Sequence, residues 1–102
     1  MINVLLVCTA GISTSLLLKK IELVAQERKI DMTIKAIGEA ESQKENLTTD
    51  VMLLGPQVRY LERAIKKINE KSPMQIAAVD ESAYSNVDGD KVVDQILELA
   101  KK

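Results

Sequence analysis

Two kinds of apolar pattern alternate along the chain: short runs, and longer stretches with helical spacing. Residues 2–7, 51–54 and 75–79 form the runs, and the first two are almost continuously apolar. Such runs are typical of strands that a parallel sheet buries on both faces. Residues 32–37 instead alternate apolar and polar side chains, which predicts a half-exposed strand at a sheet edge.

The stretches between these runs carry apolar residues three or four positions apart, which predicts helices at about 13–29, 57–71 and 88–100. The inward stripes are expected to be Leu17, Ile21, Val24 and Ala25; then Val58, Leu61, Ile65 and Ile68; and finally Val92, Val93, Ile96 and Ala100. Pro56 fits the first turn of the second helix, and Asp88 is suited to cap the third.

Two further segments are polar. Residues 38–50 contain either a short helix at about 39–44 or only a loop, and residues 80–86 have room for a helical turn.

The resulting order, β-α-β-(α)-β-α-β-α, predicts a single α/β domain over residues 1–102. We expect a three-layer sandwich in which helices cover both faces of a four-stranded parallel sheet. Right-handed crossovers and the edge position of the second strand favour strand order 2-1-3-4. Ligands in such sheets bind beyond the carboxyl ends of the strands. The loops at 8–13, 55–57 and 80–82 are therefore expected to meet at the site.

Composition removes several classes of function. The net charge is −1, from 14 basic and 15 acidic residues, so the chain lacks the basic surface of a nucleic-acid-binding protein. One cysteine and no histidine leave no internal disulfide, no zinc cluster, no Cys-His pair and no phosphohistidine on this chain. We infer no metal and no cofactor. The apolar runs are too short for a signal peptide or a membrane span, so we expect a cytoplasmic protein with a reduced thiol and no direct membrane insertion.

The candidate chemistry lies where the first strand meets its turn, at Cys8. A turn that enters a helix aims backbone N–H groups, and the positive end of the helix, at one point that attracts an anion. A cysteine at that point favours the thiolate, which is the nucleophilic form. We therefore interpret Cys8 as the catalytic residue of phosphoryl chemistry on sulfur. The residues expected to form the phosphate loop are Thr9, Ala10, Gly11, Ile12, Ser13, Thr14 and Ser15.

These residues also have structural interpretations. A single cysteine is often a small buried apolar side chain, and Gly11 is also compatible with a turn that needs a positive φ. Ser13, Thr14 and Ser15 are all suitable helix caps. Because a cap and a phosphate ligand use the same hydroxyl geometry, the sequence does not separate the two roles.

Five residues from the segments 55–57 and 80–86 are candidates for the rim of the site: Gly55, Pro56, Gln57, Asp80 and Tyr84. Gly55 and Pro56 are also a simple strand stop, and Tyr84 is also suited to packing or to the surface. Asp80 is suited either to capping a turn or to acting as a general acid.

The loop resembles the Cys-x5-Arg-Ser/Thr cradle of low-molecular-weight tyrosine phosphatases, with Thr14 at the position of the arginine. An arginine clamps the phosphoryl group bidentately and stabilises its charge during transfer. A site without it is equipped to hold a phosphoryl group and poorly equipped for rapid hydrolysis, as a carrier requires. A small cysteine-dependent phosphatase that uses Asp80 as its acid is the alternative, and an anion-binding module without chemistry is a third interpretation.

Three blocks carry a more specific resemblance. Residues 8–17, C-T-A-G-I-S-T-S-L-L, resemble the C-[ST]-A-G-[MI]-S-T-S-L-L signature of the lactose/cellobiose-type B component (enzyme IIB) of the bacterial phosphoenolpyruvate-dependent sugar phosphotransferase system. Residues 51–58 resemble the family's V-x-L-L-G-P-Q block, and residues 84–89 its Y-x-x-V-D-G segment. The blocks span nearly the whole chain.

The resemblance implies that Cys8 accepts phosphate from a phosphohistidine of the A component. It implies that Cys8 then passes the phosphate to a sugar bound by the membrane-embedded C component, such as cellobiose, chitobiose, lactose or another β-glucoside or disaccharide. The activity would be that of a protein-N(pi)-phosphohistidine–sugar phosphotransferase. The protein is expected to be a monomer alone and to work at the inner face of the membrane through the C component. The sugar, the cognate components and any role of Asp80 or Tyr84 in transfer stay open.

Overall fold

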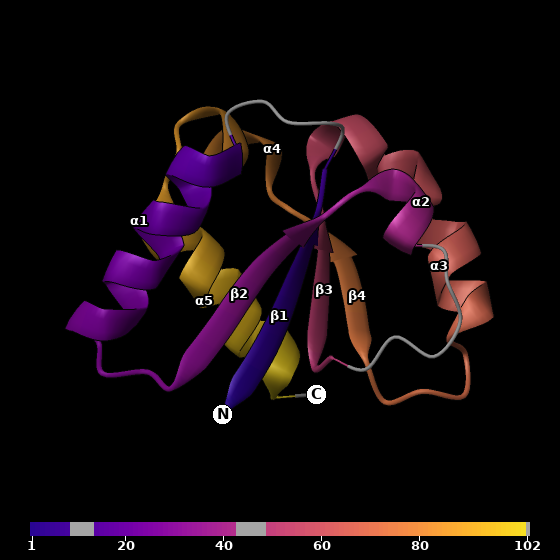
Figure 1. Ribbon diagram of the computed structural model, residues 1–102, viewed down its shortest axis with the longest axis horizontal. Helices are drawn as coiled ribbons and strands as arrows, with labels where there is room; N and C mark the ends of the chain where they lie inside the picture. The colour runs from indigo at the N-terminus through magenta and orange to yellow at the C-terminus, as the bar shows by residue number, and fades with distance from the viewer. Residues whose placement is uncertain (9–13, 43–48, 102) are drawn as a thin grey trace.

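A parallel sheet forms the centre of the computed structural model, which describes residues 1–8, 14–42 and 49–101 (Figure 1). Its strands are β1 (Ile2–Val7), β2 (Met32–Ile37), β3 (Val51–Leu54) and β4 (Gln75–Ala78). The α-helices of the described residues are α1 (Thr14–Glu27), α2 (Glu39–Ser42), α3 (Glu62–Ile68), α4 (Glu81–Ser85) and α5 (Gly89–Ala100), and a 3-10 helix, η1 (Pro56–Leu61), precedes α3.

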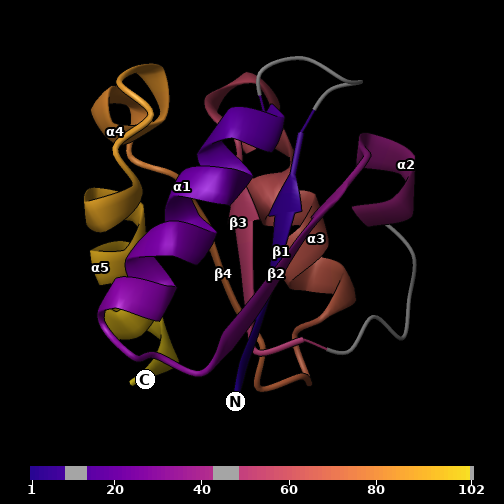
Figure 2. The ribbon, with the colours of Figure 1, turned by 60° about the vertical axis from the view of Figure 1, so that its left-hand side comes forward.

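The strand order is β2-β1-β3-β4 with every neighbouring pair parallel, which confirms the predicted 2-1-3-4 arrangement. Val7 is in register with Ile37 on one side and with Leu54 on the other. The carboxyl ends of the three strands are therefore level. Figures 1 and 2 show both chain termini at the opposite end of the sheet, where the strands begin.

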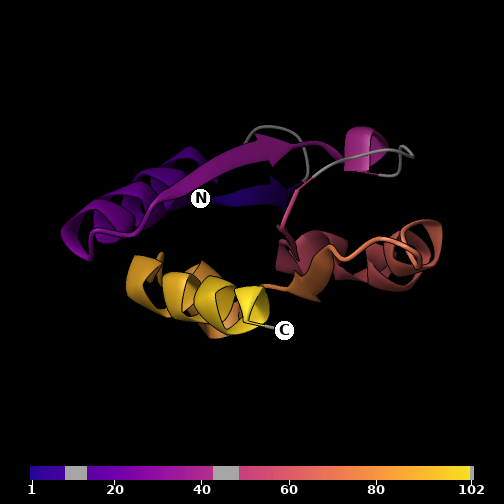
Figure 3. The same ribbon diagram turned by 90° about the horizontal axis from the view of Figure 1, so that it is seen from below.

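Helices cover both faces of the sheet, as the alternation of patterns predicts. Figure 3 shows α1 and α5 on one side and α2 and α3 on the other. Each layer has its own core. The residues buried beneath α1 and α5 include Val4, Leu6, Leu17, Ile21, Val51, Leu53, Val92, Val93 and Ile96. Those buried beneath η1 and α3 include Val7, Ile37, Met52, Leu54, Val58, Leu61 and Ile65.

Most inward positions are buried as the patterns predict, and β2 is the half-exposed edge strand. Two predictions of inward side chains are wrong. Ile68 is 40% exposed, because α3 ends there and its last turn leaves the sheet. Ala100 is exposed at the end of α5, where Leu99 is the buried residue.

The predicted continuous helix at 57–71 is also wrong. The chain forms the 3-10 helix first, and Val58 has non-helical angles (φ −120°, ψ 16°). The Val58 N–H donates to the Gly55 carbonyl at 2.9 Å, a tight turn of three residues. The interruption lies at Val58 and not at Pro56, and the backbone settles into a regular α-helix only from Glu62.

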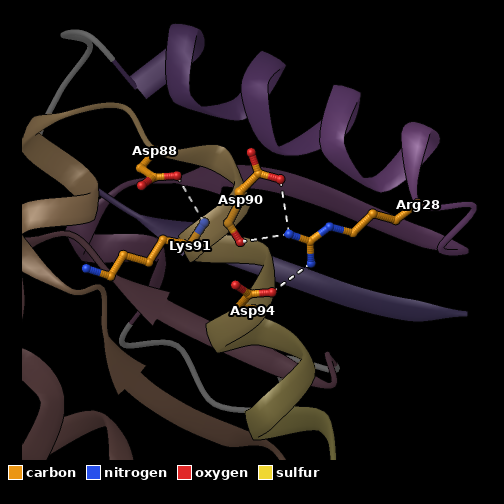
Figure 4. Close-up of polar contacts among 5 residues, drawn as sticks. All are labelled: Arg28, Asp88, Asp90, Lys91 and Asp94. Carbon is orange, nitrogen blue, oxygen red and sulfur yellow. Dashed lines mark hydrogen bonds and ion pairs between the residues drawn. The ribbon is translucent and has the colours of Figure 1, made fainter.

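Contacts between α1 and α5 fix the first layer. A Cβ atom on Gly89 would lie 2.9 Å from both the carbonyl carbon and the carbonyl oxygen of Lys20, so only glycine allows this approach. Beyond α1, Arg28 donates hydrogen bonds to Asp94 (2.7 Å) and Asp90 (3.0 Å) of α5. Figure 4 shows the guanidinium reaching both carboxylates. The two helices are thus joined at the start of α5 and at the end of α1.

Candidate functional site

Cys8 is the first residue after β1, the strand that lies between β2 and β3 in the sheet. Its N–H donates to the Ile37 carbonyl at 3.1 Å, which extends the pairing with β2 by one residue. Its thiol donates to the same carbonyl, with Sγ 3.8 Å from the oxygen. The side chain is only 8% exposed, and the cysteine is free. The candidate nucleophile is therefore held at the carboxyl end of the sheet.

The cradle expected around this sulfur falls largely outside the described residues: Thr9, Ala10, Gly11, Ile12 and Ser13. Thr14 is the first residue of α1, and Ser15 follows it with an exposed side chain. The first turn of α1 contains no acidic residue. A helix of 14 residues thus begins six positions after Cys8 without a carboxylate to neutralise the positive end of its dipole.

Three of the predicted rim residues meet beside this end of β1. The Gly55 N–H donates to the carbonyl of Val7, the residue before Cys8, at 2.9 Å. The position that a Cβ atom would take on Gly55 lies 3.1 Å from Gln57 Oε1, 3.2 Å from the Val7 carbonyl oxygen and 3.5 Å from Tyr84 Cε2. The β3 and α4 loops therefore converge here, as the topology predicts.

Pro56 follows Gly55 as the first residue of η1. It turns the chain away from the carboxyl end of β3, and Gln57 comes directly after it with an exposed side chain. Sequence reasoning placed both residues correctly at the end of β3.

Asp80 has a structural role. Its carboxylate accepts a hydrogen bond from the Ala83 N–H at 3.3 Å, which caps α4, and lies 3.4 Å from Lys91 Nζ. The capping interpretation is thus the one the geometry supports. Sequence reasoning missed Gln95, whose amide donates to the Ala78 carbonyl at 2.8 Å and accepts from the Asp80 N–H at 3.2 Å. This clamp holds the β4–α4 loop, and its long-range contacts leave no local sequence signal.

Comparisons with known proteins agree with this architecture. A 97-residue alignment relates the chain to the oligo-beta-mannoside-specific EIIB component of the phosphotransferase system of Bacillus subtilis, with 33% identity over 95% of this chain and 94% of that one. The solution structure of a cellobiose-specific phosphotransferase IIB component from Borrelia burgdorferi has a TM-score of 0.78 and 33% identity, over 98% of this chain and 92% of that one.

A lactose-specific IIB domain from Streptococcus pneumoniae has the same fold, with a TM-score of 0.82 and 22% identity over 95% of each chain. These relatives define a class, the IIB components of sugar phosphotransferase systems. The model of the family described as "PTS system, Lactose/Cellobiose specific IIB subunit" matches residues 3–95. The chain belongs to this family, as the three sequence blocks indicated.

None of the helices within residues 1–8, 14–42 and 49–101 combines the length and the apolar character that crossing a membrane requires.

Proposed function

We propose that residues 1–102 act as one IIB domain, a phosphoryl carrier that takes phosphate on Cys8 and delivers it to a sugar during uptake. The observation that carries the proposal is the position of Cys8. The only cysteine of the chain is free and follows a central strand, and Gly55, Gln57 and Tyr84 gather beside the end of that strand. Ligands of open α/β sheets bind at such a place.

The first transfer moves a phosphoryl group from nitrogen to sulfur. The N–P bond of the donor's phosphohistidine breaks as Cys8 Sγ forms an S–P bond, and the thiol proton ends on the histidine. In the second transfer the S–P bond breaks as a sugar hydroxyl oxygen forms an O–P bond, and the sulfur regains a proton from that hydroxyl. We propose that backbone N–H groups of residues 9–14 and hydroxyl groups from Ser13, Thr14 or Ser15 hold the phosphoryl oxygens in both steps.

The partners follow from this cycle. We propose that the A component supplies the phosphohistidine, and that the membrane C component binds the sugar and brings the carrier to the inner face of the membrane. Two of the relatives described above are named for oligo-beta-mannoside and cellobiose. These names support a disaccharide or oligosaccharide as the sugar, such as the β-glucoside cellobiose. Alone, the carrier is proposed to be a cytoplasmic monomer.

The phosphatase alternative has less support. It needs Asp80 as a general acid, and the Asp80 carboxylate already interacts with the Ala83 N–H and with Lys91. It also needs an arginine where the chain has Thr14, and neutral N–H dipoles stabilise the transition state of hydrolysis less than a bidentate guanidinium does.

The experiment reconstitutes the transfer chain from phosphoenolpyruvate through the general phosphotransferase proteins and a lactose/cellobiose-type A component. The wild-type protein should become phosphorylated, and it should pass the phosphate to sugar in the presence of membranes that contain the C component. The isolated phosphoprotein should decay slowly, and Thr14→Arg should accelerate its hydrolysis if the longer side chain folds over the loop. Rapid decay of wild type, or strong turnover of an aryl phosphate, would favour the phosphatase instead.

A further inference from the structure

A charged groove of about 400 Å³ runs along η1 and the start of α3. Its lining residues are Arg59, Tyr60, Glu62, Arg63 and Lys66. Three of these five side chains are basic and one is acidic, so the groove is suited to an anionic partner and not to an apolar one.

The two arginines of the groove have no partner among the residues that the structure describes. Lys66 Nζ lies 2.8 Å from the Glu62 carboxylate, and the Tyr60 hydroxyl donates to Glu39 at 2.6 Å. The exposed guanidinium groups of Arg59 and Arg63 make no hydrogen bond or ion pair with any residue of the described part of the chain. Four positions apart at the junction of η1 and α3, they leave their N–H donors available for carboxylates.

Charge is segregated between two helical segments although the net charge of the chain is only −1. Residues 56–71 contain five basic and two acidic side chains, whereas residues 80–100 contain six acidic and one basic. Figure 3 shows that α3 and α5 lie on opposite sides of the sheet. The segment that contains the groove is therefore basic, whereas the segment on the opposite side of the sheet is acidic.

The groove lies on the segment that directly follows Gly55 of the candidate site. η1 starts directly after Gly55, whose N–H donates to the carbonyl of Val7, the neighbour of Cys8. Arg59 follows Gly55 by only four residues. A protein that covers the carboxyl end of β1 and continues along η1 therefore reaches the groove.

We propose that this groove receives acidic side chains of the phosphohistidine donor and thereby orients the donor over Cys8; this inference rests on the proposed function. The donor carries the phosphoryl dianion when it docks, so a basic surface attracts it. After transfer the negative charge lies on the carrier, which weakens the attraction and favours release. The acceptor fits the groove less well, because the cytoplasmic loops of membrane proteins are rich in Lys and Arg. An anionic membrane is also a poorer fit, since lipid-binding clusters contain about four to eight basic residues.

The test reverses the two unpaired charges in Arg59→Glu/Arg63→Glu. The matched control, Lys67→Glu/Lys71→Glu, changes the charge equally on exposed residues of the same segment that do not line the groove. Both variants are checked for the wild-type melting temperature. The probe is a lactose/cellobiose-type A component phosphorylated from phosphoenolpyruvate. At low ionic strength we expect the groove variant to accept phosphate at least about tenfold more slowly than wild type, with less than about a twofold change in the control. The difference should shrink towards about 0.15 M salt.

The second half of the test isolates the phosphorylated groove variant after prolonged loading and gives it to membranes that contain the C component and sugar. Transfer to sugar should stay within about twofold of wild type, because acceptor docking does not use the groove. Equal donor rates in all three proteins, an equal loss in the control, or a loss only in the sugar step would overturn this inference alone. Binding to phosphatidylglycerol vesicles that the groove variant loses, with donor rates unchanged, would assign the groove to lipid instead. A wild type that accepts no phosphate would overturn the proposed function first and this inference with it.

Discussion

The two helical layers differ in whether their arginines are paired. In the α1–α5 layer, Arg28 binds both Asp90 and Asp94, and Lys91 lies beside Asp80. In the η1–α3 layer, the helix is interrupted at Val58, and the guanidinium groups of Arg59 and Arg63 have no partner among the described residues.

The difference separates stability from recognition. The polar contacts of the first layer are made to its own helices, so they contribute to the folded state. The open cations of the second layer contribute little to stability, and their donors are available to another molecule. Substitutions between α1 and α5 should therefore change unfolding, whereas substitutions of the open arginines should change partner binding.

The largest effect is expected where the first layer is tightest, at Gly89→Ala. The new Cβ would lie 2.9 Å from the backbone of Lys20. This backbone cannot move away without shifting α1. We expect a loss of about 1–3 kcal/mol in the free energy of unfolding, measured with urea. Gly38→Ala is the control, since a Cβ there has no atom within 4 Å, and it should leave stability unchanged or slightly higher. Equal stability of Gly89→Ala and wild type would refute the close contact.

A smaller loss is expected when the ion pairs that join the end of α1 to α5 within the first layer are broken by Arg28→Met. The hydrogen bonds with Asp94 and then Asp90 raise the pKa of Arg28 above its usual value, so the guanidinium stays charged wherever the protein is folded. The substitution keeps much of the aliphatic stem and removes the charge. The melting temperature should fall, and by less at high salt. The control is Lys19→Met, which removes an exposed lysine of α1 that has no partner among the described residues. It should lower the melting temperature less than Arg28→Met does. Equal shifts in the two variants would show that the ion pairs of Arg28 contribute nothing to stability.

A gain is expected at the end of α1, where the predicted helix to residue 29 stops at Glu27. Lys29 has a positive φ of 58°. The Ile30 N–H donates to the Ala25 carbonyl at 2.8 Å, and the Lys29 N–H donates to the Gln26 carbonyl at 3.1 Å. This is a Schellman end, in which glycine is the preferred residue. Lys29→Gly should stabilise the protein by up to about 1 kcal/mol, whereas Lys29→Ala keeps the positive φ and should bring no gain. A thermal unfolding comparison of the two variants decides the point.

The smallest effect concerns the second layer and pH. The hydrogen bond to Glu39, followed by burial and by the carboxylate charge, raises the pKa of Tyr60 above 10.0. Because the folded-state pKa is raised, this contact contributes its full stability below about pH 10 and loses it as the pH rises through the folded-state pKa. In a Tyr84→Phe background, ultraviolet titration should find Tyr60 ionising at lower pH after Glu39→Gln. An unchanged midpoint would mean that Glu39 does not hold the hydroxyl in solution.

Sequence alone predicts the sheet because its signals are local. The continuous run of β1 and the alternation of β2 each follow from neighbouring residues, and so does the Asp88 cap, which accepts from the Lys91 N–H at 3.1 Å. The 3-10 start of the second helix was missed because its apolar spacing fits a regular helix as well. The wrong inward placement of Ile68 is a separate error, because α3 ends at Ile68 where the pattern predicts a helix to residue 71.

The contacts that position the site were not predictable in this way. Gln95 clamps a loop 15 to 17 residues away, and Arg28 meets aspartates 62 and 66 residues later. Gly89 fits a helix start as well as a close contact, and only the packing of α5 on Lys20 distinguishes the two. The proximity of Gly55 and Tyr84 was predictable because parallel strands end at one edge, whereas their role at the rim of a site stays a prediction.

The proposed function requires that the phosphoryl group is carried on the sulfur of Cys8. The most direct measurement isolates the protein after phosphorylation by the A component, maps the modified residue by tandem mass spectrometry, and treats a parallel sample with iodine, which cleaves thiophosphates. The account predicts one phosphoryl group on Cys8 that iodine removes, and a folded Cys8→Ser protein that transfers no phosphate. An iodine-resistant phosphate on Ser13, Thr14 or Ser15, or wild-type sugar phosphorylation by Cys8→Ser, would contradict it.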